Sequence, residues 1–168
     1  MKRGRWSLLT CVLLMACGAK EVQQIESAPI AAAEACALDG MLLAYHEGPK
    51  AQLLRKNGER AFFCDSKEIF GELLDPVRRR QVAGIWFQAL DDARWEAHAD
   101  GWVRAEVLFF VVGSAKMGAM GPTLAPFSAR KKAEVFAREY GGEIYRFDEI
   151  GSQQMQILRE QAIAEWEK

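Results

Sequence analysis

The sequence predicts an α+β protein made of two similar units, each with the order strand, strand, helix, strand. In both halves a helix follows a phenylalanine, Phe63 in the first and Phe127 in the second, and begins at a polar residue. Both helices then lead into a short aromatic strand, at residues 85–87 and 144–147. This shared order favours two ββαβ units. The alternative is a chance similarity within a single α+β sheet.

The first unit is expected at residues 36–100 and opens with strands. Residues 42–46 and 51–55 have the composition of strands and are separated by a Gly-Pro turn. The Asn-Gly pair at 57–58 favours a hairpin, because both residue types tolerate positive φ. Residues 60–64 are then predicted to be the returning strand.

Asp65 is expected to cap the helix of the first unit, with Glu68 three residues later completing a capping box. Pro76 should close this helix, and residues 84–90 should form the last strand of the unit. The predicted buried stripe of the helix contains four apolar residues: Ile69, Phe70, Leu73 and Leu74.

The second unit is expected at residues 101–150. Residues 107–112 form an apolar strand, whereas residues 113–126 are predicted to be a loop because they are rich in glycine, proline and methionine. Ser128 should cap a helix that ends at the glycines 141–142. The remaining expected features are the helix stripe Ala133, Phe136 and Tyr140, a strand at 143–147, and a C-terminal helix or tail at 151–168.

The first 16 residues have the pattern of an export signal. Three cations precede an apolar run at 8–15, which is shorter than the about 20 residues needed to span a bilayer. Residues 14–17 resemble the lipobox of bacterial lipoproteins, in which the cysteine, here Cys17, is acylated and becomes the new N-terminus. We therefore expect a periplasmic lipoprotein with a flexible tether at 17–35, and Gly18 favours the outer membrane. The alternative is an uncleaved anchor helix.

Composition and motifs exclude several classes of protein. The chain has a formal net charge of −1 and no long basic stripe, so it is not expected to bind nucleic acid. The short basic run at 78–80 is interpreted as a solvated helix face, with an acidic partner as the alternative. No nucleophile elbow, phosphate loop or dinucleotide fingerprint occurs. His46 and His98 are too far apart for a zinc helix motif, and His98 lies in a polar segment that solvent should cover.

Soft sulfur donors near glycines are the main chemical signal. Cys36 and Cys64 are the only thiols beyond the signal and the lipid anchor, and they could form a disulfide or bind a metal. Met41 follows Cys36 around a glycine, and Met117 and Met120 lie in the glycine-rich segment. Thiolates and thioethers select Cu(I) over hard cations. Methionine is also common core filler, so the pattern alone leaves packing as an alternative.

Several motifs in sequence order resemble the NosL family of nitrous oxide reductase accessory lipoproteins. They lie at 36–41, 47–52, 62–65, 117–124 and 141–149. The resemblance implies a periplasmic Cu(I)-binding chaperone that helps to supply the copper centres of nitrous oxide reductase. It also implies a membrane transporter and assembly complex of the same pathway as partner, and a fold similar to that of the organomercurial lyases.

The motif at 36–41 departs from some members of that family, which carry a second cysteine where this chain has Asp39. A two-thiolate site inside this motif is therefore not available. The resemblance then implies that Cys36 or Met41 acts with a donor from elsewhere, for which Met120 is the first choice. The reserve donors are Met117, Cys64 and His46.

Two other functions stay open on the sequence. One is a structural lipoprotein in which Cys36 and Cys64 form a disulfide and the methionines are packed. The other is an organometal lyase that uses both thiols with Asp39. Fold analogy is weak evidence for activity, and a lipid anchor suits delivery better than cytoplasmic detoxification. The sequence therefore predicts a binding protein and not an enzyme.

The anchor assignment gives a direct prediction. Cys17→Ser removes the thiol that the acyl chains would modify, so the variant should lose incorporation of labelled fatty acid. Expression of parent and variant with a radioactive or alkyne-bearing fatty acid measures this. A label that persists on the variant would show that the anchor lies elsewhere.

Overall fold

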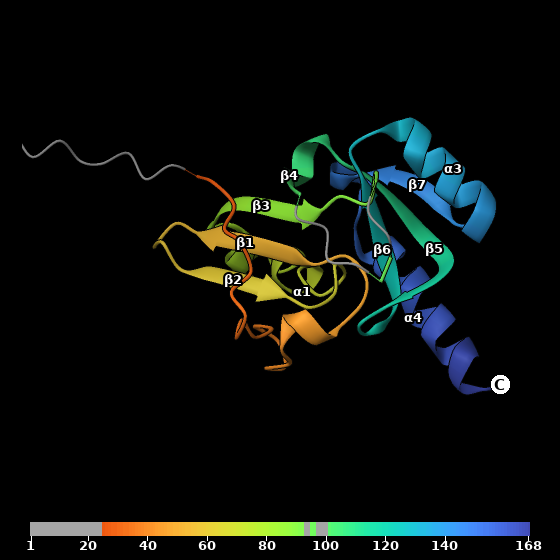
Figure 1. Ribbon diagram of the computed structural model, residues 1–168, viewed down its shortest axis with the longest axis horizontal. Coiled ribbons are helices and arrows are strands. Elements are labelled where there is room, and N and C mark those ends of the chain that lie inside the picture. Colours follow the sequence, from red (N-terminus) through yellow and green to blue (C-terminus); the bar gives the residue numbers. More distant parts are fainter. Residues whose placement is uncertain (1–24, 93–94, 97–100) are drawn as a thin grey trace, which may run out of the picture.

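The computed structural model describes residues 25–92, 95–96 and 101–168 and contains two antiparallel sheets with helices beside them (Figure 1). One sheet has four strands and the other has three. The predicted α+β class is therefore confirmed. Both halves of the chain also run through strand, strand, helix and strand in that order.

The first sheet is built around β1 (Ala51–Arg55). It pairs on one side with β2 (Arg60–Phe63) and on the other with β3 (Val82–Gln88), and β4 (Trp102–Arg104) pairs with β3. The hairpin predicted at 57–58 is present, and only its glycine uses positive φ. The first sheet therefore also includes β4, which lies beyond the predicted end of the first unit at residue 100.

The strand predicted at residues 42–46 is wrong. The structure has a 3₁₀ turn, Leu43–Tyr45, in which Leu43 is buried and Tyr45 is exposed. The backbone nearby makes only an isolated bridge between Ala35 and Leu42 among the described residues. Residues 42–44 are all apolar, which favours a strand, but only Leu43 among them is buried.

The single helix predicted after Asp65 is two short helices, α1 (Phe70–Leu73) and α2 (Pro76–Arg79). Pro76 opens the second helix instead of simply closing the first, because proline fits the first helical position, where its missing N–H is not needed. Ile69, Phe70 and Leu73 are buried as predicted, but Leu74 is 38% exposed, so the predicted stripe was one residue too wide.

The second sheet has β5 (Phe109–Gly118) at its centre, between β6 (Gly121–Phe127) and β7 (Glu143–Arg146). The loop predicted at 113–126 is therefore wrong: β5 and β6 form a long hairpin through it. Residues 122–127 are buried, and buried backbone must be hydrogen-bonded, which the strand pairing achieves. The two sheets share one arrangement, in which the second strand and the strand after the helix flank the first.

Two long helices complete the second half. The helix predicted after Ser128 is α3 (Arg130–Tyr140), and it ends before Gly141 as expected, with φ of 75° at that glycine. Ser128 is not its cap: Asp91 accepts hydrogen bonds from the Ser128 and Ala129 backbone N–H groups at 2.9 Å. The predicted terminal helix is α4 (Ser152–Trp166), which packs against β5 and β6.

One hydrophobic core joins the two halves. Phe87 of β3 meets Phe110 of β5 edge to face, with ring centroids 4.9 Å apart. Leu53 from the first sheet and Leu124 from the second belong to the same cluster. The predicted flexible tether is already packed from Ala28, whose backbone exchanges two hydrogen bonds with the Gln52 amide.

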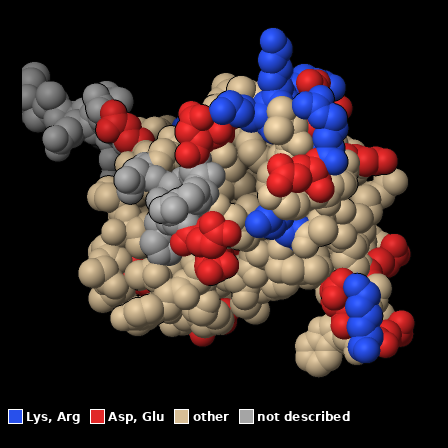
Figure 2. Space-filling view, turned by 45° about the vertical axis from the view of Figure 1, so that its right-hand side comes forward, with Lys and Arg blue, Asp and Glu red and all other residues tan. Residues whose placement is uncertain are grey.

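On the face in Figure 2, acidic and basic side chains lie close to one another at the periphery, beside broad uncharged areas. No helix in the described part of the chain is long and apolar enough to cross a membrane.

Gly118 of β5 lies so close to the first half of the chain that a larger residue should not fit there. A Cβ on Gly118 would collide with Asp65 Oδ2, so Gly118→Ala should lower the free energy of unfolding by about 1–3 kcal/mol through overpacking. Gly71→Ala is the matched control, since nothing lies within 4 Å of its Cβ and alanine favours helix α1. Urea unfolding of both variants measures the difference. Equal effects would show that the two halves do not meet as described.

Candidate metal site

Cys36 is held by a tight turn that lies against the end of β2. Its N–H donates to the Met41 carbonyl at 2.8 Å, and its own carbonyl accepts from the Gly40 N–H at 2.9 Å. The following N–H, of Ala37, donates to the Phe62 carbonyl at 2.8 Å. Gly40 takes a φ of 78°, which only glycine adopts without strain. This turn therefore fixes the Cys36 thiol beside the residue that follows β2.

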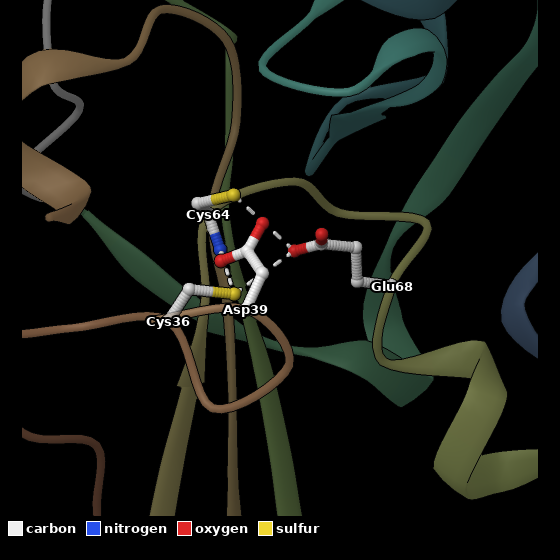
Figure 3. Close-up of side chains that lie close together, drawn as sticks. All are labelled: Cys36, Asp39, Cys64 and Glu68. Carbon is white, nitrogen blue, oxygen red and sulfur yellow. Dashed lines mark hydrogen bonds between the residues drawn. The ribbon is translucent and has the colours of Figure 1, made fainter. Parts of the chain in front are cut away.

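That residue is Cys64. Its backbone N–H donates to Cys36 Sγ at 3.5 Å, and both cysteines are buried free thiols. Both thiols donate to the same atom, Glu68 Oε2, at 3.3 Å from Cys36 and 3.4 Å from Cys64. Figure 3 shows the two sulfur atoms and the Glu68 carboxylate pointing toward one another. The structure thus brings together two thiols that are 28 positions apart in the sequence.

Asp39 completes a cluster of four potential metal ligands. One ligand atom from each of Cys36, Asp39, Cys64 and Glu68 lies within 4.8 Å of all the others (Figure 3). Asp39 comes from the exposed turn, whereas Glu68 is 8% exposed. Such spacing suits donors that surround a single ion, and the cluster has one side open to solvent.

Glu68 uses its two oxygens very differently. Oε2 accepts from both thiols and from the Asp65 N–H at 3.1 Å, which is half of the predicted capping box. Oε1 is buried without a hydrogen-bond partner among the described residues. An unpaired buried carboxylate oxygen is costly, and a bound cation would give it an electrostatic partner. The donor set and this oxygen therefore fit a metal ion.

The electrostatics of the apo cluster keep the thiols protonated. Burial raises the pKa of the Cys36 thiol. Burial, reinforced by the negative charge of Glu68, raises the pKa of the Cys64 thiol further above its usual range. Each thiol consequently serves as a hydrogen-bond donor to Glu68 until a metal displaces its proton.

Lys50 is a fully buried cation on the same face of the sheet as Cys64. It immediately precedes β1, and the register of β1 with β2 places it opposite Cys64. Burial lowers the pKa of Lys50, and the nearby acidic groups Cys64, Asp65 and Glu68 oppose that effect. Its ammonium donates to three consecutive backbone carbonyls, those of His46, Glu47 and Gly48, at 2.6, 3.1 and 2.8 Å. Lys50 therefore places a cationic side chain on the face of the sheet that carries Cys64.

The segment after Cys64 holds the tip of the β5–β6 hairpin. Asp65 Oδ2 accepts from the Met120 N–H at 3.1 Å, and its Oδ1 accepts from the Thr123 hydroxyl. The Ser66 hydroxyl donates to the Leu124 carbonyl at 2.6 Å, and the Lys67 ammonium donates to the Met120 and Pro122 carbonyls. Met120 thereby lies in the wall of a hollow that Glu68 also lines.

The structure places only some of the predicted donors at the cluster. Cys36 and Cys64 meet, Met41 packs against their cluster, and Met120 shares a hollow with Glu68. Met117 is 37% exposed on β5, with its carbonyl accepting from the Trp95 indole, and His46 is not part of the four-residue cluster. Cys17 and His98 lie outside the described residues.

Glu68 is the ligand candidate that the sequence reasoning missed, because it was assigned only to the capping box. Its position four residues after Cys64 was a usable signal, since side chains at that spacing share one side of a helical turn. The sequence suggests Asp39 only as a residue of the alternative lyase, yet its carboxylate lies in the cluster.

Comparison with known proteins now identifies the family. The NosL family model matches residues 27–155. The chain belongs to the NosL family. The motif resemblance read from the sequence is therefore confirmed, and it spans both sheets.

Individual NosL proteins agree with this assignment. The chain is 34% identical over 153 residues to the copper-binding lipoprotein NosL of Stutzerimonas stutzeri, covering 88% of this chain and 80% of that one. It is 35% identical over 118 residues to the copper-binding lipoprotein NosL of Achromobacter cycloclastes, covering 66% and 60% of the two chains.

A solved NosL structure also matches the fold. The crystal structure of the copper chaperone NosL from Shewanella denitrificans superposes with a TM-score of 0.73 at 36% identity, covering 77% of this chain and 98% of that one. These NosL proteins are named as copper-binding lipoproteins and as a copper chaperone, and the prediction of a binding protein and not an enzyme agrees with that family.

The shared carboxylate predicts how the apo thiols should react. Glu68→Gln removes the negative charge that raises the Cys64 pKa, so thiolate should form more readily at neutral pH. Alkylation by iodoacetamide should accelerate, by about tenfold for each pH unit by which the thiol pKa falls. The control is Glu134→Gln, which removes the same charge from a solvent-accessible side chain of α3, outside the cluster. Equal rates in parent and Glu68→Gln would contradict the described arrangement.

Proposed function

We propose that this chain is a lipid-anchored periplasmic chaperone that carries Cu(I) for the maturation of nitrous oxide reductase. One observation carries the proposal. Two buried free thiols, Cys36 and Cys64, both donate hydrogen bonds to the carboxylate of Glu68. Copper is the cargo named for the relatives, and thiolate donors favour its cuprous form.

The geometry supports Cys36 and Cys64 as the principal donors, with Met120 as the third. The two thiols are adjacent, so one Cu(I) can replace both of their protons. Met120 comes from the other half of the chain and is held nearby by Asp65. Cys64, a reserve donor on sequence grounds, thus becomes a principal one. Met41 is the next alternative, ahead of Met117 and His46.

A disulfide between the cysteines receives no support. Both are free thiols, and both donate to Glu68, which a disulfide could not do. Glu68 Oε2 would then lose both thiol donors and keep only the Asp65 N–H, at a cost in stability. A purely structural role for the two cysteines is therefore the weaker proposal.

The proposed anchor, location and partners follow from the sequence and the family. Cys17 lies in a lipobox-like segment, and the relatives are named lipoproteins. Gly18 after it favours the outer membrane. The proposed receiver of copper is the membrane transporter and assembly complex that serves nitrous oxide reductase, and through it the reductase itself.

The common strand order of the two sheets also supports an origin from repeated ββαβ units, in a fold similar to that of the organomercurial lyases.

Competition for Cu(I) tests the donor assignment. The reduced protein, without an affinity tag, is titrated with Cu(I) against a chelator of known affinity. Cys36→Ser and Cys64→Ser should each weaken binding most, because serine leaves no soft donor. Met120→Leu keeps the volume but removes the sulfur, and we expect a loss of about tenfold, which is about 1.4 kcal/mol.

The pH dependence of the same titration separates thiolate from thioether binding. The raised thiol pKa values mean that Cu(I) must displace protons, so affinity should rise with pH, by up to about tenfold per pH unit for each thiol. A site made of Met120 and Met41 alone would show little pH dependence. Binding that none of these substitutions changes would overturn the copper proposal for this site.

A further inference from the structure

A hollow of about 500 Å³ opens beside the thiol cluster. Its walls come from both halves of the chain: the turn that contains Cys36, the start of α1, the tip of the β5–β6 hairpin, and α4. Glu68 lies in its wall, and Figure 3 shows this side chain reaching from the α1 side to the two thiols. A second, smaller hollow beside α3 contains no residue of the cluster. The larger hollow therefore borders the cluster through Glu68.

Exposed apolar side chains surround this hollow. Leu38 is 65% exposed, Met120 is 41% exposed and Leu74 is 38% exposed, although they come from three separate segments. Exposed apolar groups that converge on one concavity are typical of sites where another molecule binds, because that molecule removes their surface from water. Methionine suits such a surface, since its flexible side chain adapts to different shapes.

Two cations also line the hollow, and neither forms an ion pair in the part of the chain that the structure describes. The Lys67 ammonium donates to the Met120 and Pro122 carbonyls, and the Arg159 guanidinium lies 3.5 Å from the Gln156 amide oxygen. The carboxylate of Glu68 faces the thiols. The hollow therefore offers positive charge to an occupant.

We propose that this hollow is the docking site of the protein that exchanges copper with this chain, and that the docked segment carries an apolar side chain flanked by carboxylates. The inference rests on the proposed function, because handover of Cu(I) requires the donor atoms of the partner to reach the metal. The apolar rim binds the apolar side chain, and Lys67 and Arg159 bind the carboxylates. Such charge complementarity speeds association and excludes basic partners.

The test uses the metal-free protein, so its outcome does not depend on copper binding. The probe is a short synthetic peptide with methionines flanked by aspartates, and the comparison peptide has lysines at those positions. Backbone amide shifts measured by NMR should move at Leu38, Met120 and Arg159 with the acidic peptide. Arg159→Glu should weaken that binding by about tenfold and favour the basic peptide.

Arg138→Glu is the matched control, since it makes the same charge change on an exposed position of α3, away from the hollow. It should leave peptide binding unchanged, and Arg159→Glu should leave the affinity for Cu(I) unchanged. Equal losses in both variants, shifts elsewhere on the surface, or binding of anionic phospholipid vesicles in place of the peptide would overturn the docking proposal. A protein that fails to bind Cu(I) would overturn the proposed function, whatever the peptide does.

Discussion

The attachment of the β5–β6 hairpin to the segment after Cys64 is the constraint on which the rest of the structure depends. Asp65 is only 1% exposed, and burial raises its pKa while hydrogen bonds from Thr123 and the Lys67 and Met120 N–H groups lower it. A buried carboxylate is tolerated only when it is well hydrogen-bonded. Asp65 therefore holds the hairpin, and it does so next to a cysteine of the candidate metal site. The same contact fixes the backbone of Met120 at the tip of the hairpin.

The same arrangement explains how a buried site remains reachable. The thiols are covered by the turn at 36–41 on one side and by the hairpin tip on the other, both of which are surface segments. Neither belongs to the main core, which lies between the two sheets and includes Phe87 and Phe110. Small movements of the covering segments would expose the thiols without disturbing that core, so protection from oxidation and access for exchange are compatible.

The sequence predicted the elements that local patterns determine and missed those that long-range contacts determine. The strands β1 and β3 and the helices α3 and α4 follow from periodicity and from turn residues. The β5–β6 hairpin was missed because its glycines and prolines are typical of loops. Here Gly118 is required by the approach of Asp65, which lies more than fifty positions away. No local signal could have predicted that contact.

In the candidate site, too, local patterns were predictable and long-range contacts were not. The electrostatics of the cluster also bear on how a bound metal would be released. Cys36 and Cys64 were recognisable from composition, but the carboxylate they share was not, because Glu68 also makes the local capping contact that the sequence predicted. That second role has a chemical consequence. A buried carboxylate that accepts from both thiols stabilises their protonated form, so protons compete with the metal for the sulfur atoms. Lys50 offsets part of the negative charge. In the function we propose, a site between these opposing charges would bind a soft cation without holding it permanently, which is the property that a carrier needs and a storage site does not.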